Sequence, residues 1–332
     1  MKDLSTNYLG LQLRNPIIVG SSGLTDSVEK IRTLEQSGAA AVVLKSLFEE
    51  EILFELEEDK HKMTSRFYVY PETYDYMDHD ELYQEDLVRQ YLRLISEAKA
   101  SVKIPVIASI NCVSGQKWTY LAREIEKAGA DALELNLFIL PSDLNRSADT
   151  NTELYFEIIE AVKKEVNIPI ALKMSYYFTN LAEIIQKLSA TGIKGLVLFN
   201  RFFSPDFDIE NFVVTPSNVL SSPSSQSLPL RWIAIMANRV KCDLAASTGI
   251  HNGESVIKQL LAGATAVQIT SAIYNHGPEL IPKLLQTLND WMERHEFESI
   301  ENFKGMMSQA NSLDPASYER VQFMKHFRSF IR

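Results

Sequence analysis

The stretch WTYLAREIEKAGADALELNL, from Trp118 to Leu137, contains one complete repeat of the fold. Its apolar residues recur at three- and four-residue spacing up to Lys127, and Gly129 then supplies a helix stop. A short apolar run, ALELNL (132–137), follows directly. Such a run is typical of a parallel strand that is covered on both faces. The stretch therefore predicts a helix that leads into a buried strand.

The same pattern recurs along the chain. Three of the helix–strand joins read GAAA, GADA and GATA. The apolar runs are PIIVG (16–20), AAVVLKS (40–46), PVIASIN (105–111), ALELNL (132–137), PIALKM (169–174), GLVLFN (195–200), DLAAST (243–248) and AVQITSA (266–272). Eight such strands alternating with helices predict an α/β protein with a (β/α)8 TIM barrel. The rival, a doubly wound sheet, usually carries GxGxxG after its first strand, and this chain has no GxG.

The composition bounds the class of protein. The chain has 332 residues, 45% of them hydrophobic, and a formal net charge of −10. This charge argues against nucleic acid or an anionic membrane as partner, because both require a basic face. Cys112 and Cys242 form no CxxC motif and no apolar run is long enough to span a membrane, so we expect a soluble cytoplasmic protein. The scattered histidines show no paired spacing, and we expect no metal site.

Two long insertions interrupt the repeat, one after the second strand (47–82) and one after the sixth (201–230). Both should lie on the rim where barrel enzymes build their active sites. The first begins with the acidic run FEEEILFELEEDK (48–60), which we interpret as a solvated helix face. It continues with RFYVYPETYDYMDHD (66–80), which predicts a lid or a pocket wall, or a loop packed on its own aromatic side chains or on a second subunit.

The end of the chain lies beyond the barrel pattern. We expect residues 1–305 to form a single barrel domain and residues 306–332 to form a helical tail, because residues 318–332 carry an apolar helical stripe with basic residues outside it. The tail is expected to pack on the barrel or on a neighbouring subunit. In the second case the protein would be a homodimer.

Polar residues stand where the apolar strands end, the position at which barrel enzymes place their chemistry. Lys45, Asn136, Lys173 and Asn200 each end a different strand. A lysine at the tip of an apolar strand needs an anionic partner, either a structural carboxylate or a ligand. Small polar residues at the first three strand ends leave room for a flat ligand; they are Gly20, Ser21, Ser22, Ser46 and Ser109.

The last two strand ends indicate a phosphate site. Ser247, Thr248 and Gly249 precede a helix, and Thr270 and Ser271 precede a short turn. Small and hydroxyl residues there free backbone N–H groups for a phosphate, which this fold usually binds in these two loops. A phosphate on one side of the mouth and lysines on the other predict FMN. A barrel enzyme that acts on a phosphosugar without flavin is an alternative.

The motifs NPIIVGSSG, VVLKS, IASIN, GADALELNL, ALKM, VLFN, STGI and GATAVQITSAI, in this order, resemble the class 1-like FMN barrel of the dihydroorotate dehydrogenase family. The stretch from IASIN through LELNL is also similar to the FMN domain of dihydropyrimidine dehydrogenase. The resemblance implies an oxidoreductase that acts on CH–CH bonds in pyrimidine metabolism. It implies that hydride would pass between a small dihydropyrimidine-type substrate and FMN while a base removes a proton.

The resemblance also implies a set of site residues. Lys45, Asn136 and Asn200 would bind the substrate or the flavin ring, and Lys173 would face the flavin. The residues implied to hold the cofactor are Gly20, Ser21, Ser22, Lys45, Ser46, Ser109, Asn136, Lys173, Asn200, Ser247, Thr248, Gly249, Thr270 and Ser271.

The chain departs from the family on the substrate side. Where the family reads N-L-S-C-P-N, this chain reads NLFILP (136–141), which places Ile139 at the position of the usual catalytic base. A replacement acid–base group is expected from Ser142, from Asp143 or from a tyrosine of the loop after the second strand. Ser221 and Ser222 stand where the family has a Gly-Gly phrase. A flavin-binding protein without dihydroorotate turnover is therefore a further alternative.

Overall fold

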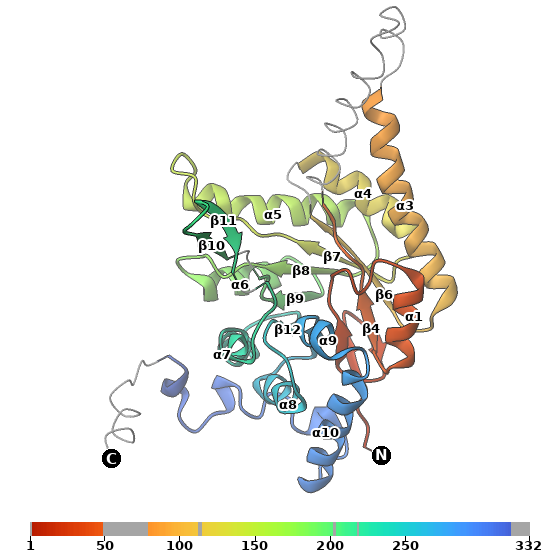
Figure 1. Ribbon diagram of the computed structural model, residues 1–332. Helices are drawn as coiled ribbons and strands as arrows, with labels where there is room; N and C mark the ends of the chain where they lie inside the picture. The colour runs from red at the N-terminus through yellow and green to blue at the C-terminus, as the bar shows by residue number, and fades with distance from the viewer. Residues whose placement is uncertain (1, 49–78, 112–114, 202–203, 218, 320–332) are drawn as a thin grey trace, which may run out of the picture.

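The computed structural model shows parallel strands closed into a barrel with helices around it (Figure 1). The structure describes residues 2–48, 79–111, 115–201, 204–217 and 219–319. Within these ranges each of the predicted apolar runs contains a barrel strand, so the predicted (β/α)8 barrel is confirmed.

The barrel strands are short and parallel, and they follow one another around the barrel in chain order. They are β3 (Ile17–Val19), β4 (Ala41–Val43), β6 (Val106–Asn111), β7 (Ala132–Asn136), β8 (Ile170–Met174), β9 (Gly195–Leu198), β12 (Asp243–Ser247) and β13 (Ala266–Ile269). Strand β4 pairs with both β3 and β6, and this double pairing closes the barrel. Strand β5 (Leu47–Phe48) follows β4 along the chain and pairs in parallel with the end of β6.

Helices cover the outside of the barrel (Figure 1). They are α1 (Val28–Gln36), α3 (His79–Ser101), α4 (Gly115–Lys127), α5 (Ala148–Glu165), α6 (Leu181–Ser189), α7 (Ser227–Met236), α8 (Gly253–Ala262), α9 (Ser271–His276) and α10 (Leu280–Arg294). Their ends carry local signals. The Asn252 side chain caps α8 by accepting from the Ser255 N–H, and Gly263 ends that helix in the left-handed region.

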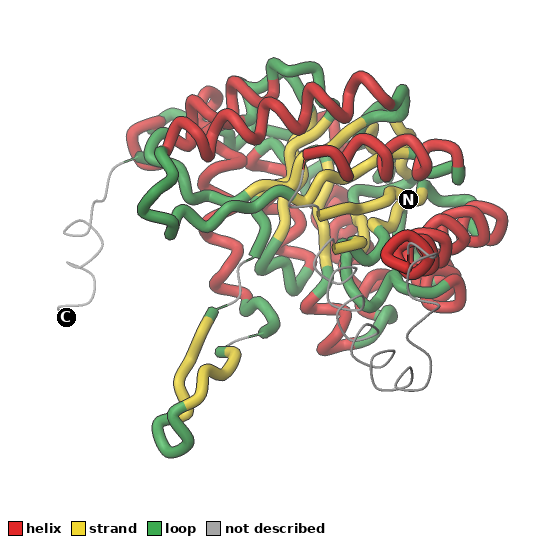
Figure 2. Tube along the Cα trace, turned by 90° about the horizontal axis from the view of Figure 1, so that it is seen from above, coloured by secondary structure: helices red, strands yellow, loops and turns green. Residues whose placement is uncertain are grey.

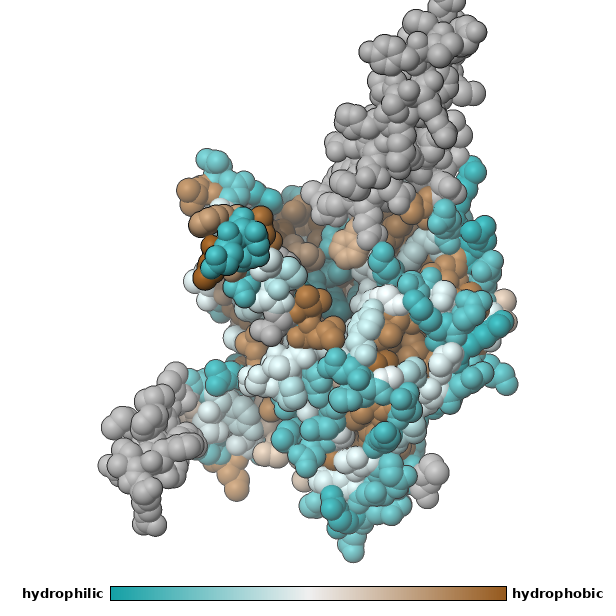
Figure 3. Space-filling model, in the orientation of Figure 1, coloured by the Kyte–Doolittle hydropathy of each residue, from teal (hydrophilic) through white to brown (hydrophobic). Residues whose placement is uncertain are grey.

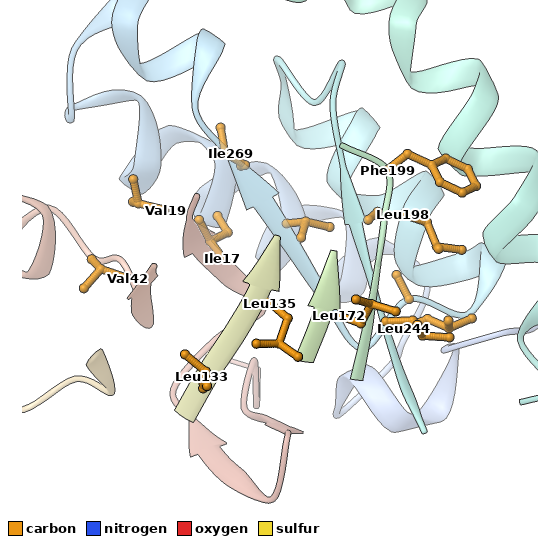
Figure 4. Packing of buried hydrophobic residues seen from close by; sticks show 14 of the residues in the cluster. Ile17, Val19, Val42, Leu133, Leu135, Leu172, Leu198, Phe199, Leu244 and Ile269 are labelled. Carbon is orange, nitrogen blue, oxygen red and sulfur yellow. The ribbon is translucent and has the colours of Figure 1, made fainter. Parts of the chain in front are cut away.

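The strands are apolar on both faces, as continuous apolar runs predict. Outward-facing residues of β3, β4, β7, β8, β9, β12 and β13 pack in one large cluster against the helices (Figure 4). The inward-facing residues form a second cluster that is filled largely by small side chains. Its alanines are Ala40, Ala41, Ala132, Ala171, Ala245 and Ala266.

A hairpin of β1 (Thr6–Tyr8) and β2 (Leu11–Leu13) closes the amino end of the barrel. Leu9, in its turn, is buried among the inward-facing residues, and its N–H donates to Asp243 Oδ2 at 2.8 Å. Gly195 makes room for the hairpin, since a Cβ there would lie 2.5 Å from the Leu9 side chain. The plugged amino end leaves the carboxyl ends of the strands as the place for a site.

The insertion after β9 contains a hairpin of β10 (Pro205–Asp208) and β11 (Val213–Pro216) that projects from the body (Figure 2). These strands were not predicted, and α7 begins inside the predicted insertion, residues 201–230. The facing residues Phe207 and Val214 are both exposed. In the space-filling view the molecule is hollowed beside this hairpin, with apolar residues at the edge (Figure 3).

The segment after the barrel runs through two short 3-10 helices, η4 (Gln309–Asn311) and η5 (Pro315–Tyr318). Arg239, which follows α7, donates to Gln309 Oε1 at 2.6 Å. The acidic run and the tyrosine-rich stretch of the first insertion lie almost entirely outside the described residues, as do Cys112 and residues 320–332 of the expected helical tail. The division into a barrel and a helical tail stays a prediction.

Candidate active site

A cavity of about 290 Å³ lies at the carboxyl ends of the barrel strands. Several residues singled out in the sequence meet in its walls: Ser21, Lys173, Asn200, Ser247, Thr248, Gly249, Thr270 and Ser271. They come from the ends of β3, β8, β9, β12 and β13. Hydroxyl, amide and ammonium groups thus surround one cavity, and such a lining suits a ligand with anionic and carbonyl oxygens.

Three predicted serines form a hydrogen-bonded chain across neighbouring strand ends. The hydroxyls of Ser21 and Ser46 lie 3.1 Å apart, and those of Ser46 and Ser109 lie 2.6 Å apart. Tyr91 of α3 holds the far end, because its hydroxyl donates to the Ser109 carbonyl and accepts from the Ser109 N–H. Burial raises the pKa of Tyr91 well above its usual value. The chain fixes the ends of β3, β4 and β6 relative to one another.

The end of β3 approaches β13 closely. A Cβ at Gly20 would lie 2.8 Å from Thr270 Oγ1 and 3.5 Å from the Gln268 side chain, so a residue without a side chain is needed there. The Ser22 hydroxyl donates to the Gly20 carbonyl at 3.1 Å and thus stays within its own loop.

The two predicted asparagines contact each other. Asn200 Nδ2 donates to Asn136 Oδ1 at 2.6 Å, and the backbone N–H of Arg201 donates to Asn200 Oδ1 at 2.9 Å. Asn136 is buried, whereas Asn200 is half-buried and lines the cavity. A fixed pair of amides presents both donors and acceptors, which suits a ring with carbonyl and N–H groups.

Lys173 belongs to a buried network inside the barrel. Its ammonium donates to Gln268 Oε1 at 3.1 Å and lies 3.8 Å from Glu134 Oε1. The Gln268 amide also donates to the other carboxylate oxygen of Glu134. Glu134 is 1% exposed. The sequence left two partners open for the lysine, a structural carboxylate or a ligand; the structure supplies the carboxylate and also places the lysine in the cavity wall.

The predicted phosphate loops meet the insertion after β9. The Gly249 N–H donates to Ser221 Oγ at 3.3 Å, and the Ser221 N–H donates to Ser271 Oγ at 3.0 Å. Ser221 Oγ also lies 3.2 Å from His251 Nε2. Burial lowers the pKa of His251 below its usual value, which favours the neutral ring. Thr248 and Gly249 both have positive φ, so this loop has an unusual backbone shape.

Several predicted residues do not line this cavity; they are Gly20, Ser22, Lys45, Ser46, Ser109, Asn136, Ile139 and Ser142. Lys45 is exposed and lines a separate cavity of about 410 Å³ with Ser46 and Tyr91. Ile139 lines a third cavity, of about 630 Å³, beside α5 and α6. Ser142 lies on the exposed loop after β7, and its N–H donates to the Leu140 carbonyl.

Further polar residues of the site were not predicted to bind a ligand, although Ser221 had been noted for its place in a family motif. Arg201 and Ser221 line the cavity within the insertion, while Gln268 and Glu134 lie in the barrel interior. The Arg201 guanidinium donates to the Val219 carbonyl at 2.6 Å, and burial lowers its pKa. A signal for the interior pair was present, since each is a polar residue within an apolar strand and such residues need a buried partner.

Other features bear on the chemistry. Burial raises the pKa of Cys242 to about 12, so its thiol is not a nucleophile at neutral pH. Among the described residues no cluster of His, Cys, Asp and Glu side chains could hold a metal ion. None of the described helices is both long and apolar enough to cross a membrane.

Comparison with known proteins gives a consistent picture. The family model described as "Dihydroorotate dehydrogenase" matches residues 79–292. The catalytic subunit of dihydroorotate dehydrogenase B (NAD(+)) from Thermoplasma volcanium is 27% identical over 310 residues, which cover 92% of this chain and 99% of the relative. The same subunit from Methanothermobacter thermautotrophicus is 26% identical, covering 91% and 98%. A putative dihydroorotate dehydrogenase A (fumarate) from Aeropyrum pernix is 24% identical, covering 93% and 98%.

Proposed function

Because the chain belongs to the dihydroorotate dehydrogenase family, we propose that it is an FMN-dependent oxidoreductase that transfers hydride between a small dihydropyrimidine-type substrate and the flavin. One observation carries this proposal. Lys173 and the Asn136–Asn200 pair converge on the same barrel mouth as the hydroxyls of Ser247 and Thr270.

The donors around the cavity fit FMN in two parts. Ser247, Thr248, Thr270 and Ser271 supply hydroxyl groups for a single phosphate at the loops after β12 and β13. Lys173, at the cavity floor, supplies the cation for the electron-rich ring. When bound, FMN supplies the hydride acceptor, which no amino-acid side chain can replace.

The remaining residues have roles in binding and orientation. The Asn136–Asn200 amides hold a planar ring by its carbonyl and N–H groups, and their mutual hydrogen bond fixes both side chains before binding. Arg201 lines the cavity beside Asn200, so it can pair with a substrate carboxylate. We assign Lys45, which follows β4, to binding of the substrate.

We propose that the usual base position is held by Ile139 and that dihydroorotate oxidation is slow. An aliphatic side chain takes no proton, and a positioned general base contributes ~10²–10⁴-fold in rate. Ile139 lines a different cavity from Lys173. Ser142, the proposed replacement, is exposed, so it needs a loop movement to act. These observations also favour the second candidate function, flavin binding without dihydroorotate turnover.

The test starts with the protein as purified. We expect a flavin absorbance spectrum, and chromatography of the released chromophore should identify FMN. FAD, or no flavin after reconstitution, would overturn the proposal. Anaerobic mixing with dihydroorotate and with dihydrouracil, which lacks the carboxylate, then separates the two candidate functions: bleaching by either substrate supports the oxidoreductase. A stronger response to dihydroorotate that disappears in Arg201→Gln would assign the carboxylate to Arg201.

Electron acceptor, assembly and location are part of the same proposal. The names of the relatives include both NAD(+) and fumarate, so reoxidation should be assayed with both. We propose a homodimer, supported by the exposed apolar pair Phe207 and Val214 on the projecting hairpin. We also propose a cytoplasmic location, in keeping with a chain that has only two cysteines and no CxxC motif. Light scattering with Phe207→Ser tests the dimer.

A further inference from the structure

A buried charge pair under the cavity is held apart in an unusual way. Lys173 and Glu134 stand on neighbouring strands, two register positions apart, because Lys173 pairs with Asn136 and Glu134 with Ala171. Their closest charged atoms are nevertheless 3.8 Å apart. Elsewhere in the molecule Lys99 and Asp131 form an ion pair at 2.7 Å, the normal length of a charge-assisted hydrogen bond. Two buried opposite charges attract strongly at low dielectric, so something must prevent direct contact.

The obstacle is the amide of Gln268, which reaches across the barrel from β13. Its oxygen accepts from the Lys173 ammonium and its nitrogen donates to Glu134. The amide has one orientation only, because an ammonium can only donate and a carboxylate can only accept. Gln268 is 3% exposed and packs against the end of β3 at Gly20, so it cannot swing away.

The separation of Lys173 from Glu134 costs free energy. Glu134 is almost fully buried, and its Oε1 has no hydrogen-bond partner among the described residues. A buried acceptor without a partner costs about 1–3 kcal/mol, and more when it is charged. A direct contact with Lys173 would remove this cost. The separation of 3.8 Å therefore indicates that the Lys173 ammonium has a role that direct pairing with Glu134 would prevent.

We propose that Gln268 is a positioning residue that keeps the Lys173 ammonium out of direct contact with Glu134, so that the ammonium remains available to a group in the cavity. Glu134 supplies the counter-charge that draws Lys173 down to the cavity floor. This inference adds a positioning residue to the proposed flavin site. Where the group in the cavity is taken to be the flavin, the inference rests on the proposed function. An ammonium has three N–H donors, so one bond to Gln268 leaves donors for a ligand.

The decisive variant is Gln268→Met, which has similar length but no polar amide. Lys173 should then move onto Glu134 and withdraw from the cavity. In the holoprotein the ratio of affinities for reduced and oxidised FMN, obtained from the midpoint potential, should fall on the order of tenfold. Adding Glu134→Gln in the same chain should restore most of that loss, because the carboxylate that captured the lysine is gone.

The rescue separates positioning from simple damage to the core. If Gln268 were only a packing residue, the second substitution would add a second defect, and a double variant no better than Gln268→Met would overturn the proposal. Gln259→Met is the matched control, since Gln259 is also a fully buried glutamine but lies in α8 outside the barrel. We expect it to leave the potential unchanged.

A second measurement is independent of the flavin. In a crystal structure of flavin-free Gln268→Met, the distance between Lys173 Nζ and the Glu134 carboxylate should shorten from 3.8 Å to about 2.8 Å. An unchanged distance would overturn the proposal even if the protein binds FMN. If the protein binds no flavin but the distance shortens, the proposed function fails while the role of Gln268 stands.

Discussion

The two sides of the barrel mouth are built differently. On the side of β12 and β13, two of the predicted phosphate residues, Gly249 and Ser271, are joined by hydrogen bonds through Ser221. On the side of β7, the loop after Asn136 is exposed through residues 140–147. Leu144, in that loop, is fully exposed. The difference teaches that this barrel fixes its proposed cofactor side by hydrogen bonds between loops, whereas its proposed substrate side is a loop that the barrel hardly constrains.

The largest effect on the rate of flavin reduction is expected from a substitution of Lys173. Lys173→Met removes the cation beside the proposed flavin, and loss of such a stabilising group costs on the order of 10²–10³-fold in rate. Stopped-flow measurement of flavin reduction should show this fall while the fold is retained. Lys187→Met is the control, because Lys187 forms an exposed ion pair with Glu183 in α6. Equal rates for both variants would show that Lys173 only balances Glu134.

The next test concerns how tightly the phosphate loop is packed. A Cβ at Gly249 would lie 2.1 Å from the backbone nitrogen of Gln226, so the substitution Gly249→Ala must displace the backbone. We expect this variant to lose about 3 kcal/mol in the free energy of unfolding. Gly10 has the same φ of +80° and no atom within 4 Å. Gly10→Ala should therefore cost only ~1 kcal/mol, the strain of a positive φ. Chemical denaturation of the two variants measures the difference. Similar losses would mean that backbone strain, not packing, decides.

A smaller effect is expected on the substrate side. Ile139→Cys returns a titratable group to the usual base position, and we expect dihydroorotate-dependent flavin reduction to rise less than ~10-fold, well short of a full general-base contribution. The reason is that Ile139 lines the cavity beside Tyr155 rather than the one beside Lys173. Anaerobic stopped-flow assays measure it. Full activity in Ile139→Cys would show that the loop closes on substrate, and fast wild-type turnover would make Ser142 the next residue to replace.

The smallest effect should be a pH dependence of stability. The pKa of His251 is lowered on folding by burial, so the unfolded chain binds the proton more readily than the folded one. The stabilising contribution is therefore present above the unfolded value of 6.5 and is lost as the pH falls below it. The melting temperature of flavin-free protein should fall less between pH 7 and pH 5.5 in His251→Gln than in wild type. Parallel curves would show that His251 is not the group responsible.

The sequence could predict the fixed side because its signals are local. Each strand is a continuous apolar run, and each site residue there follows directly from where a run ends, as Lys173 and Ser247 do. Partners across the barrel are a different matter. Nothing in the local sequence shows that Gln268 reaches Lys173, which is 95 positions away. The projecting hairpin was missed because most residues of its two strands are exposed, so they carry no pattern of burial.

The plug at the amino end of the barrel has a consequence for the order of folding during synthesis. Leu9 is made early, yet its hydrogen-bond acceptor, Asp243, follows 234 positions later. Thr6 likewise donates to the carbonyl of Thr265. Contacts this distant in sequence form slowly, because the intervening chain must be ordered first. The first residues to leave the ribosome must therefore wait, with apolar side chains uncovered, for the last strands of the barrel, and that interval is when a nascent chain is most prone to aggregate.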